Sequence, residues 1–167
     1  MPDVTVRDAT VDDVPAIRHV AERGWDAAYD DVLSRETIDA AMARWYSPEA
    51  VRAFVEREGA ASLVAERDGE VVGYATGGLG DEETVTTLSA VYADPEHWGE
   101  GVGTALLDRF EQFCRKRGYD AFEIRVLAEN RVGRSFYRSR GYDVVETGET
   151  DLFDERVREC LFRGRIE

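Results

Sequence analysis

A glycine-rich turn in the middle of the chain joins a β-branched segment to an amphipathic one, and this succession constrains the fold most. Residues 84–92 are rich in threonine and valine and predict a strand. After the turn at residues 98–103, an apolar stripe predicts a helix, with Leu106, Leu107, Phe110, Phe113 and Cys114 on one face. Residues 122–126 then alternate between apolar and charged, as in a strand. A strand–helix–strand crossover is therefore expected, and such crossovers are almost always right-handed.

Three helices are predicted before this crossover and one after it. The first has an apolar stripe formed by Val14, Ile17, Ala21, Trp25 and Ala28, with Thr10 and Asp12 as candidate caps. The second begins near Arg35, and the third begins at Ser47-Pro48-Glu49 and ends near Gly59. The last helix runs from a cap at Asn130 through Arg140 to Gly141.

The remaining segments predict strands, so the expected fold is a mixed α/β (α+β) sheet covered by helices. Residues 62–67 and 70–76 flank Asp68-Gly69, a strong two-residue hairpin signal. A short strand is expected at residues 4–7, and a closing hairpin is expected from residues 142–145 and 157–162. The prediction is a mostly antiparallel central sheet of about six or seven strands. With no repeat or linker in 167 residues, a single domain spanning 1–167 is expected.

Several classes of protein are excluded by what the chain lacks. Its apolar runs are only a few residues long, so no transmembrane helix is expected. The first residues have neither a basic lead nor an apolar core, so no signal peptide is expected. The expected location is therefore the cytoplasm. Cys114 and Cys160 form neither a disulfide framework nor a metal site, and their apolar surroundings predict buried thiols.

The charge of the chain is strongly negative. Thirty-five acidic residues against 21 basic ones give a formal net charge of −14, which disfavours nucleic acid as a partner because phosphate backbones are repelled. Lys116 is the only lysine, and acidic excess with arginine in place of lysine resembles the cytoplasmic proteins of halophilic archaea. Salt adaptation is one interpretation of this surface. Attraction of a cationic amine substrate is the other.

The glycine-rich turn is a candidate anion site, because a helix N-terminus offers free N–H groups and glycine lets the backbone approach a phosphate. A Walker loop needs a lysine directly after Gly103, and Thr104 stands there. A dinucleotide fingerprint starting at Gly99 needs glycine at position 104. The turn alone is compatible with two further interpretations. One is a pyrophosphate site for coenzyme A, and the other is a connector that binds no ligand.

Two longer motifs resemble the GNAT superfamily of N-acetyltransferases. Residues 90–107 resemble its acyl-CoA segment, and Asn130, Phe136-Tyr137 and Gly141-Tyr142 resemble its second motif, with Gly133 where alanine is usual. The order of elements upstream matches as well, so the resemblance covers nearly the whole chain. It implies the acyl-CoA N-acyltransferase fold and acetyl-CoA as cosubstrate, with no metal.

Carried over position by position, the resemblance assigns roles to individual residues. The backbone amides at the turn would hold the pyrophosphate, namely those of Trp98, Gly99, Glu100, Gly101, Val102, Gly103 and Thr104. Val91 and Ala93 would pair with the pantetheine arm as an added strand would, and Asn130 would contact the same arm. Tyr137 would approach the sulfur as general acid. Trp98 is a departure, because the family usually has glutamine or arginine there.

Acetyl transfer to an amine also needs a base, because a free aliphatic amine is almost fully protonated at neutral pH. Thr87 stands where relatives often have a glutamate, so the expected base is absent. The other candidates are an ordered water and four side chains: Glu82, Glu83, His97 and Glu123. Trp25 and Tyr29 share a helix face and are candidates for the acceptor pocket.

The resulting expectation is an acetyl-CoA-dependent N-acetyltransferase that works by direct attack in a ternary complex. The acceptor is a protein N-terminus, a lysine, a polyamine or another small amine, and the sequence does not choose among them. Thr87 and Trp98 also motivate an alternative, a non-catalytic acyl-CoA-binding sensor of the same fold. A Rossmann-type oxidoreductase ranks third. No membrane partner is expected, and homodimers are common in the resembled family.

Overall fold

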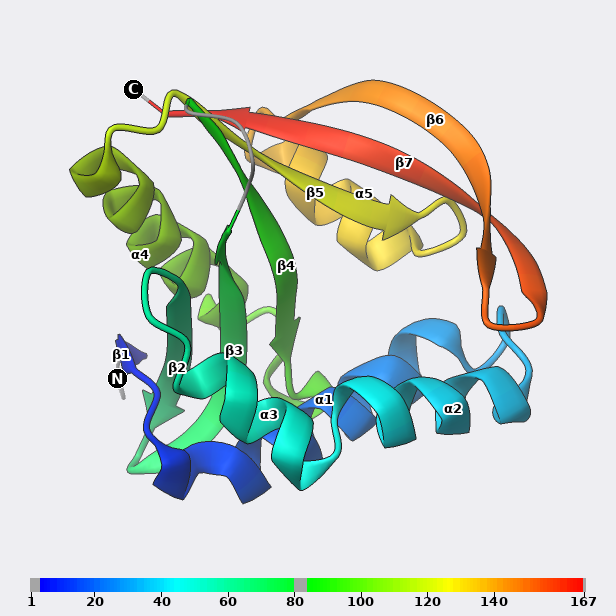
Figure 1. The fold of residues 1–167 in the computed structure, drawn as a ribbon, viewed down its shortest axis with the longest axis horizontal. Coiled ribbons are helices and arrows are strands. Elements are labelled where there is room, and N and C mark those ends of the chain that lie inside the picture. The colour runs from blue at the N-terminus through cyan, green and yellow to red at the C-terminus, as the bar shows by residue number, and fades with distance from the viewer. Residues whose placement is uncertain (1–3, 80–83, 167) are drawn as a thin grey trace.

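The fold is a seven-stranded sheet with helices on both faces (Figure 1). The computed structural model describes residues 4–79 and 84–166. The strands follow the order β1-β2-β3-β4-β5-β7-β6, and only the β4–β5 pair is parallel. Their bounds are β1 Thr5–Asp8, β2 Ala61–Arg67, β3 Glu70–Leu79, β4 Val85–Ala93, β5 Ala121–Leu127, β6 Asp143–Leu152 and β7 Glu155–Arg165. The predicted mixed, mostly antiparallel sheet is confirmed.

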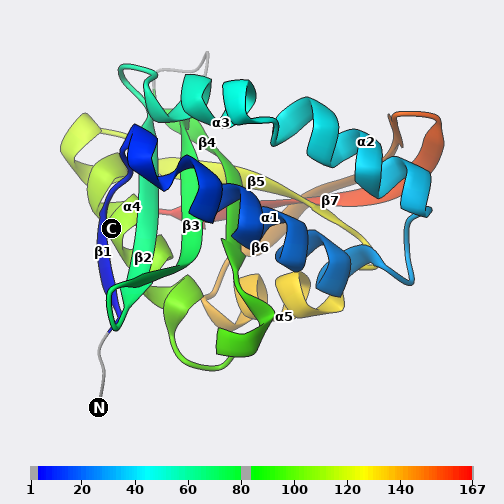
Figure 2. The ribbon, with the colours of Figure 1, turned by 90° about the horizontal axis from the view of Figure 1, so that it is seen from below.

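The helices form two layers, one on each face of the sheet (Figure 2). One layer contains α1 Val14–Tyr29, α2 Arg35–Trp45 and α3 Pro48–Val55, and the other contains α4 Val102–Arg117 and α5 Arg131–Ser139. Two short 3-10 turns complete the elements, η1 Val11–Asp13 and η2 Pro95–His97. Successive side chains of a strand point to opposite faces, so Leu63 packs in the core beneath α4 while Val64 packs beneath α1. Within residues 4–79 and 84–166, none of the helices is both long and apolar enough to span a membrane.

Local signals in the sequence set several element boundaries as predicted. The Ser47 side chain accepts the N–H of Ala50 at 3.1 Å and caps α3. Asp68 and Gly69 adopt φ values of 54° and 79° and turn β2 into β3. Gly118, with φ of 80°, ends α4 in the left-handed conformation that glycine adopts without strain.

Several boundaries differ from the predictions: α1 begins at Val14 after Asp13, rather than after a cap at Thr10 or Asp12, and β3 extends to Leu79. The α3 helix ends at Val55 rather than near Gly59, which instead lies in the connection to β2 with φ of 83°. The closing hairpin is much longer than residues 142–145 and 157–162, because β6 and β7 pair out to their tip, with one bulge between Val144 and Glu146. The start of α2 holds this tip: the N–H of its cap residue Ser34 and the hydroxyl of Thr37 donate to Glu155 Oε1 at 3.1 and 2.8 Å. This tertiary contact has no local sequence signal.

Strands β4 and β5 separate after a short parallel pairing. They pair only at residues 85–87 and 121–123, and they diverge beyond these rows (Figure 1). Ser89 is the extra residue of a bulge, because Ala90 lies opposite Thr76 while Leu88 lies opposite Gly77. The edge of β4 that faces β5 is therefore unpaired over its second half.

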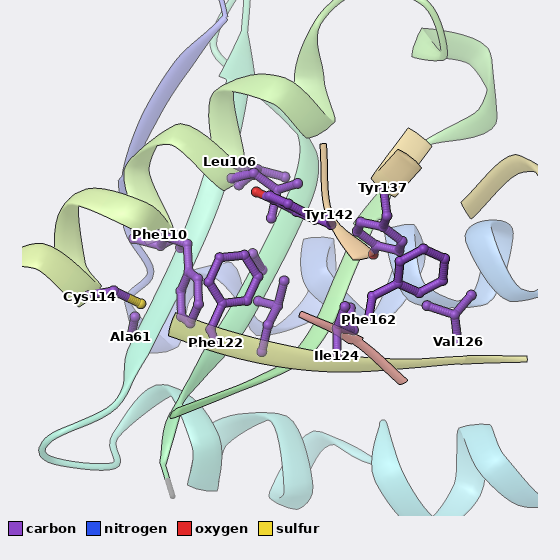
Figure 3. Packing of buried hydrophobic residues seen from close by; sticks show 14 of the residues in the cluster. Ala61, Leu106, Phe110, Cys114, Phe122, Ile124, Val126, Tyr137, Tyr142 and Phe162 are labelled. Atoms are coloured by element: carbon purple, nitrogen blue, oxygen red, sulfur yellow. The ribbon is translucent and has the colours of Figure 1, made fainter. Parts of the chain in front are cut away.

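An aromatic cluster fixes the two helices that border this opening (Figure 3). Phe122 of β5 makes edge contacts with Phe110 of α4 at 5.2 Å and with Tyr142 at 5.3 Å between ring centroids. Tyr137 of α5 stacks on Tyr142 at 6.2 Å and lies 5.6 Å from Phe162 of β7. The cluster thereby sets where α4 begins and where Tyr137 lies.

Candidate active site

The opening between β4 and β5 forms a cavity of about 480 Å³. Residues 89–93 of β4 line one side, residues 124–126 of β5 line the other, and the glycine-rich turn and α5 close the ends. The N–H of Asp94 donates to the carbonyl of Val72 on β3 at 2.8 Å. Because the direction of backbone polar groups alternates along a strand, those of Val91 and Ala93 point away from β3, into the cavity. These are the two residues to which the resemblance assigns the pantetheine arm.

The N-terminus of α4 faces this cavity with free donors. Gly101 is the cap residue of the helix, with φ of 85°, and Gly99 has φ of 83°. A Cβ at either glycine would meet no atom within 4 Å, so the turn is open on its outer side. The N–H groups of residues 102–104 have no acceptor within the helix because they belong to its first turn. These donors and the positive end of the helix dipole suit a phosphate group.

The other residues predicted at the turn divide between the cavity and its surroundings. Gly103 and Thr104 line the cavity. The Val102 side chain is buried in the core, so only its backbone is available to a ligand. Glu100 is not among the residues that line the cavity, and its carboxylate pairs with Arg67 and with His97 Nδ1. These pairs compensate part of its negative charge beside the turn.

The packing of α4 against α5 requires a glycine at position 103, which the sequence alone did not reveal. A Cβ at this position would lie 2.9 Å from Cζ of Phe136 on α5, much closer than an ordinary contact. The glycine therefore lets α4 and α5 approach each other. Steric blocking of a ligand by a side chain is not the first consequence of replacing it.

Asn130 connects the start of α5 to α1. Its Oδ1 accepts the N–H of Gly133 at 2.9 Å, as a helix cap does, and its Nδ2 donates to the Tyr29 hydroxyl at 3.2 Å. Asn130 and Tyr29 both line the cavity. Burial raises the pKa of Tyr29, so its hydroxyl stays protonated at neutral pH. A structural role for Asn130 is thus present alongside the predicted ligand contact.

Tyr137 is 5% exposed and lines the cavity, where its hydroxyl makes no hydrogen bond to any described residue. Burial raises the pKa of this phenol well above its ordinary value near 10. The neutral hydroxyl is therefore the form that meets a ligand. It can donate a hydrogen bond to a leaving thiolate, whereas net ionisation of Tyr137 is unfavourable.

Of the candidate side chains for the base that the structure describes, only His97 lines the cavity. Thr87 is exposed and lines neither this cavity nor the second one described below. The Glu123 carboxylate accepts from Nε of Arg163 at 2.9 Å and also lines neither cavity. Glu82 and Glu83 lie outside the described residues. His97 does line the first cavity, with its ring held by Glu100 at 3.0 Å.

The thiols lie in the protein interior, as predicted. Cys114 and Cys160 are both free and buried. Burial raises the pKa of the Cys114 thiol to about 12, so it is no nucleophile at neutral pH.

A second cavity of about 360 Å³ lies against the first, on the side of α1–α3. Trp25 lines this second cavity whereas Tyr29 lines the first, so the predicted acceptor pair is divided between them. Sequence reasoning missed five of the residues that line the second cavity: Trp45, Tyr46, Phe54, Arg57 and Ser89. They come from separate elements, and only the adjacent aromatics Trp45-Tyr46 offered a local signal.

Comparison with known proteins places the chain among acetyltransferases. Residues 17–142 match the model of the Acetyltransferase (GNAT) family. The chain is 26% identical over 160 residues to the spermidine N(1)-acetyltransferase of Thermoplasma acidophilum, covering 93% of this chain and 98% of that protein. It is 27% identical over 150 residues to an uncharacterized N-acetyltransferase of Methanocaldococcus jannaschii. That alignment covers 85% of this chain but 62% of the length of the relative.

Solved structures share the fold over nearly the whole chain. The PaiA N-acetyltransferase of Thermoplasma acidophilum, crystallised in complex with coenzyme A, has a TM-score of 0.85 at 23% identity. The match covers 98% of this chain and 99% of that one. An N-acetyltransferase of Staphylococcus aureus has a TM-score of 0.76 at 20% identity, covering 99% of each chain. At these identities the likeness establishes the fold.

Proposed function

The chain belongs to the Acetyltransferase (GNAT) family, as the sequence motifs predicted, and on this premise we propose that it transfers the acetyl group of acetyl-CoA to a primary amine. The observation that carries the proposal is the cavity between β4 and β5. It combines a phosphate-binding helix end, an unpaired strand edge and a neutral tyrosine in one continuous space.

Each part of acetyl-CoA has a complementary part of this cavity. The pyrophosphate fits the free N–H groups at the start of α4. The pantetheine arm carries amide groups that fit the outward backbone groups of Val91 and Ala93, as an added strand would. The thioester then lies toward Tyr137. The relative of similar fold from Thermoplasma acidophilum was crystallised with coenzyme A, which supports this assignment.

The reaction follows from direct attack. The neutral amine nitrogen attacks the thioester carbonyl carbon, and the oxyanion that forms is stabilised by a backbone N–H near Val91. The C–S bond then breaks and its electron pair stays on sulfur. The amine loses one proton and the coenzyme thiolate gains one, so the products are an amide and free coenzyme A. Tyr137 donates a hydrogen bond to the sulfur as its charge develops.

The proposal is tested by release of free thiol from acetyl-CoA in the presence of a panel of amines, with coenzyme binding measured separately by calorimetry. Thiol release that requires an amine, with one acetyl-amide formed per thiol, is the expected result. Coenzyme binding without thiol release for any amine would instead support the non-catalytic sensor. Absence of coenzyme binding would remove the basis for both.

A further inference from the structure

We infer that the second cavity is the acceptor site, and that it takes an amine carried on an aromatic or bulky apolar body with an anionic group at its far end. This inference rests on the proposed acetyl transfer and adds the chemical class of the acceptor. It differs from a polyamine, the substrate class in the name of the relative from Thermoplasma acidophilum.

The two cavities meet on β4, where the reaction has to occur. Ser89, Ala90 and Tyr92 line both of them. Ser89 is exposed and is the extra residue of the bulge, so the strand is locally irregular at the junction. An amine entering from the second cavity therefore reaches the strand edge to which the thioester is assigned. A nucleophile in the second cavity and an acyl donor in the first then meet beside the residues that line both cavities.

Aromatic rings dominate the second cavity. Its lining includes Trp25, Trp45, Tyr46, Phe54 and Tyr92. Trp25 lies 6.0 Å from Trp45 and 6.4 Å from Tyr92 between ring centroids. Trp45 is 42% exposed, and Phe153 at the tip of the closing hairpin lies 5.2 Å from it. A large exposed tryptophan beside a cavity offers apolar surface to a flat or bulky ligand.

Arg57 gives the cavity its charge. It is the only charged residue among the described ones that line the cavity, and it makes no ion pair with any described residue. A guanidinium suits a carboxylate, which it can bind through two parallel hydrogen bonds. It repels a second ammonium group. A polyamine would place further positive charges beside Arg57 with no carboxylate lining this cavity among the described residues.

The position of Arg57 separates the two ends of the acceptor. Ala61, Gly77 and Leu88 form one row across β2, β3 and β4. Two strand spacings therefore separate the start of β2 from Leu88, roughly 10 Å. Arg57 precedes this row on the β2 side, and Ser89 follows it on the β4 side. The anionic group therefore lies on the β2 side of the cavity and the reacting nitrogen on its β4 side, and a benzene ring with a short chain is the spacer chosen for the test.

The same lining bears on how an amine loses its proton, because no Asp or Glu of the described residues lines either cavity. Removal from water disfavours an ammonium ion and lowers the pKa of the bound amine. The aromatic lining of the cavity supplies this effect. The released proton then passes to water, through the open side of the cavity.

The test compares four amines as acceptors, in molar KCl so that the general attraction of the acidic surface for cations is screened. The probes are 4-(2-aminoethyl)benzoate, its methyl ester, phenethylamine and spermidine. The carboxylate and its neutral ester differ only in the group expected to meet Arg57. We expect kcat/KM for the carboxylate to exceed that for the ester about three- to tenfold, and spermidine to be the poorest of the four.

Variants of Arg57 assign the preference to this residue. In Arg57→Gln the carboxylate and the ester become equal, and in Arg57→Glu the ester is preferred. The matched control is Arg52→Gln on α3, because Arg52 pairs with Glu56 and lies outside the cavity. This control should keep the wild-type preference. A wild-type enzyme that prefers spermidine, or a preference unchanged in Arg57→Gln, would overturn the inference.

Binding without turnover separates this inference from the proposed function. The sequence has three tryptophans, and Trp25 and Trp45 line the second cavity, so in a Trp98→Phe background the fluorescence reports its occupancy. Saturable quenching by 4-(2-aminoethyl)benzoate that Arg57→Gln weakens supports the acceptor site even if no amine is acetylated, and then only the proposed function fails. Turnover of spermidine without any quenching by the aromatic acid contradicts the acceptor class alone.

Discussion

The indole nitrogen of Trp98 donates a hydrogen bond of 3.1 Å to the carbonyl oxygen of Ala93. This carbonyl belongs to the strand edge assigned to the pantetheine arm, so the tryptophan already occupies one of its acceptor sites. A carbonyl oxygen has two lone pairs and can accept a second hydrogen bond. The unusual residue at position 98 thus uses its one side-chain N–H donor to hold the end of β4 in place.

Replacement of Trp98 tests this interpretation. Trp98→Phe removes the N–H donor and keeps an aromatic ring, and the phosphate donors at the turn are backbone groups that remain. We expect the Kd for coenzyme A, measured by calorimetry, to change less than about threefold, within the net value of one hydrogen bond. A loss of affinity beyond tenfold in a folded variant would show that the side chain itself binds the coenzyme.

Position 103 is expected not to tolerate any side chain, because Phe136 packs against Gly103. In Gly103→Ala the new Cβ would lie 2.9 Å from Cζ of that ring, and overpacking of this kind destabilises by about 1 to 3 kcal/mol. Urea denaturation measures the change. Adding Phe136→Leu should recover much of it, and Gly148→Ala is the control because its Cβ would meet no atom within 4 Å. Equal stability of the Gly103 and Gly148 variants would contradict the packing argument.

Tyr137→Phe is expected to lower kcat about 100-fold or more, with the coenzyme Kd and the thermal midpoint nearly unchanged. The change removes one hydroxyl that makes no hydrogen bond to any described residue. Burial raises the pKa of Tyr137, so the wild-type rate should show no decline from ionisation of this residue up to about pH 10. Single-turnover measurements check that the observed rate is that of acetyl transfer and not that of product release. A decline near pH 10 that the variant lacks would place the phenol in water instead.

The stability of the protein is expected to depend on Asp13 at neutral pH and to lose this dependence in acid. The hydrogen bonds from Arg7, at 2.8 and 2.9 Å, and from the N–H of Thr10 lower the pKa of Asp13. The stabilisation is therefore full above the unfolded-state pKa, about 3.9, and is lost as pH falls through the lower folded-state pKa. Asp13→Asn should cost about 1 to 2 kcal/mol at pH 7.

Thermal unfolding at a series of pH values checks this prediction. The difference between wild type and Asp13→Asn should shrink as pH falls below about 4, and the exposed neighbour Asp12→Asn should show little difference at any pH. A constant difference across the acid range would mean that packing, and not the charge of Asp13, accounts for the loss.

The formal net charge of −14 predicts that salt stabilises the protein. The Debye length falls from about 30 Å at 0.01 M salt to about 3 Å at 1 M, so repulsion among surface carboxylates is strongly reduced. The thermal midpoint and the activity should both rise from dilute buffer to molar KCl. Further gain at several molar would point to stronger apolar burial or ion binding. If both are highest in dilute buffer, the acidic surface serves to attract a cation rather than to tolerate salt.

Local signals in the sequence determined the helices and strands. They also determined the part of the candidate site that is built from residues close together in the chain. The glycines at 99 and 101, the helix that follows them and the caps at Ser47 and Asn130 all act within a few residues of themselves. Backbone conformation and capping depend on such short-range contacts. The anion-binding end of α4 and the mostly antiparallel sheet were therefore predictable, and so was the family.

Only the tertiary structure decided where distant residues meet. Asn130 bonds to Tyr29 across 101 positions of the chain. Trp25 and Tyr29 share one helix face, yet they line different cavities because β4 lies between the two spaces. Arg57 and Ser89 likewise become parts of one cavity through the pairing of β2, β3 and β4. Contacts of this kind depend on strand pairing and on how the layers pack, and no residue carries a local propensity for either.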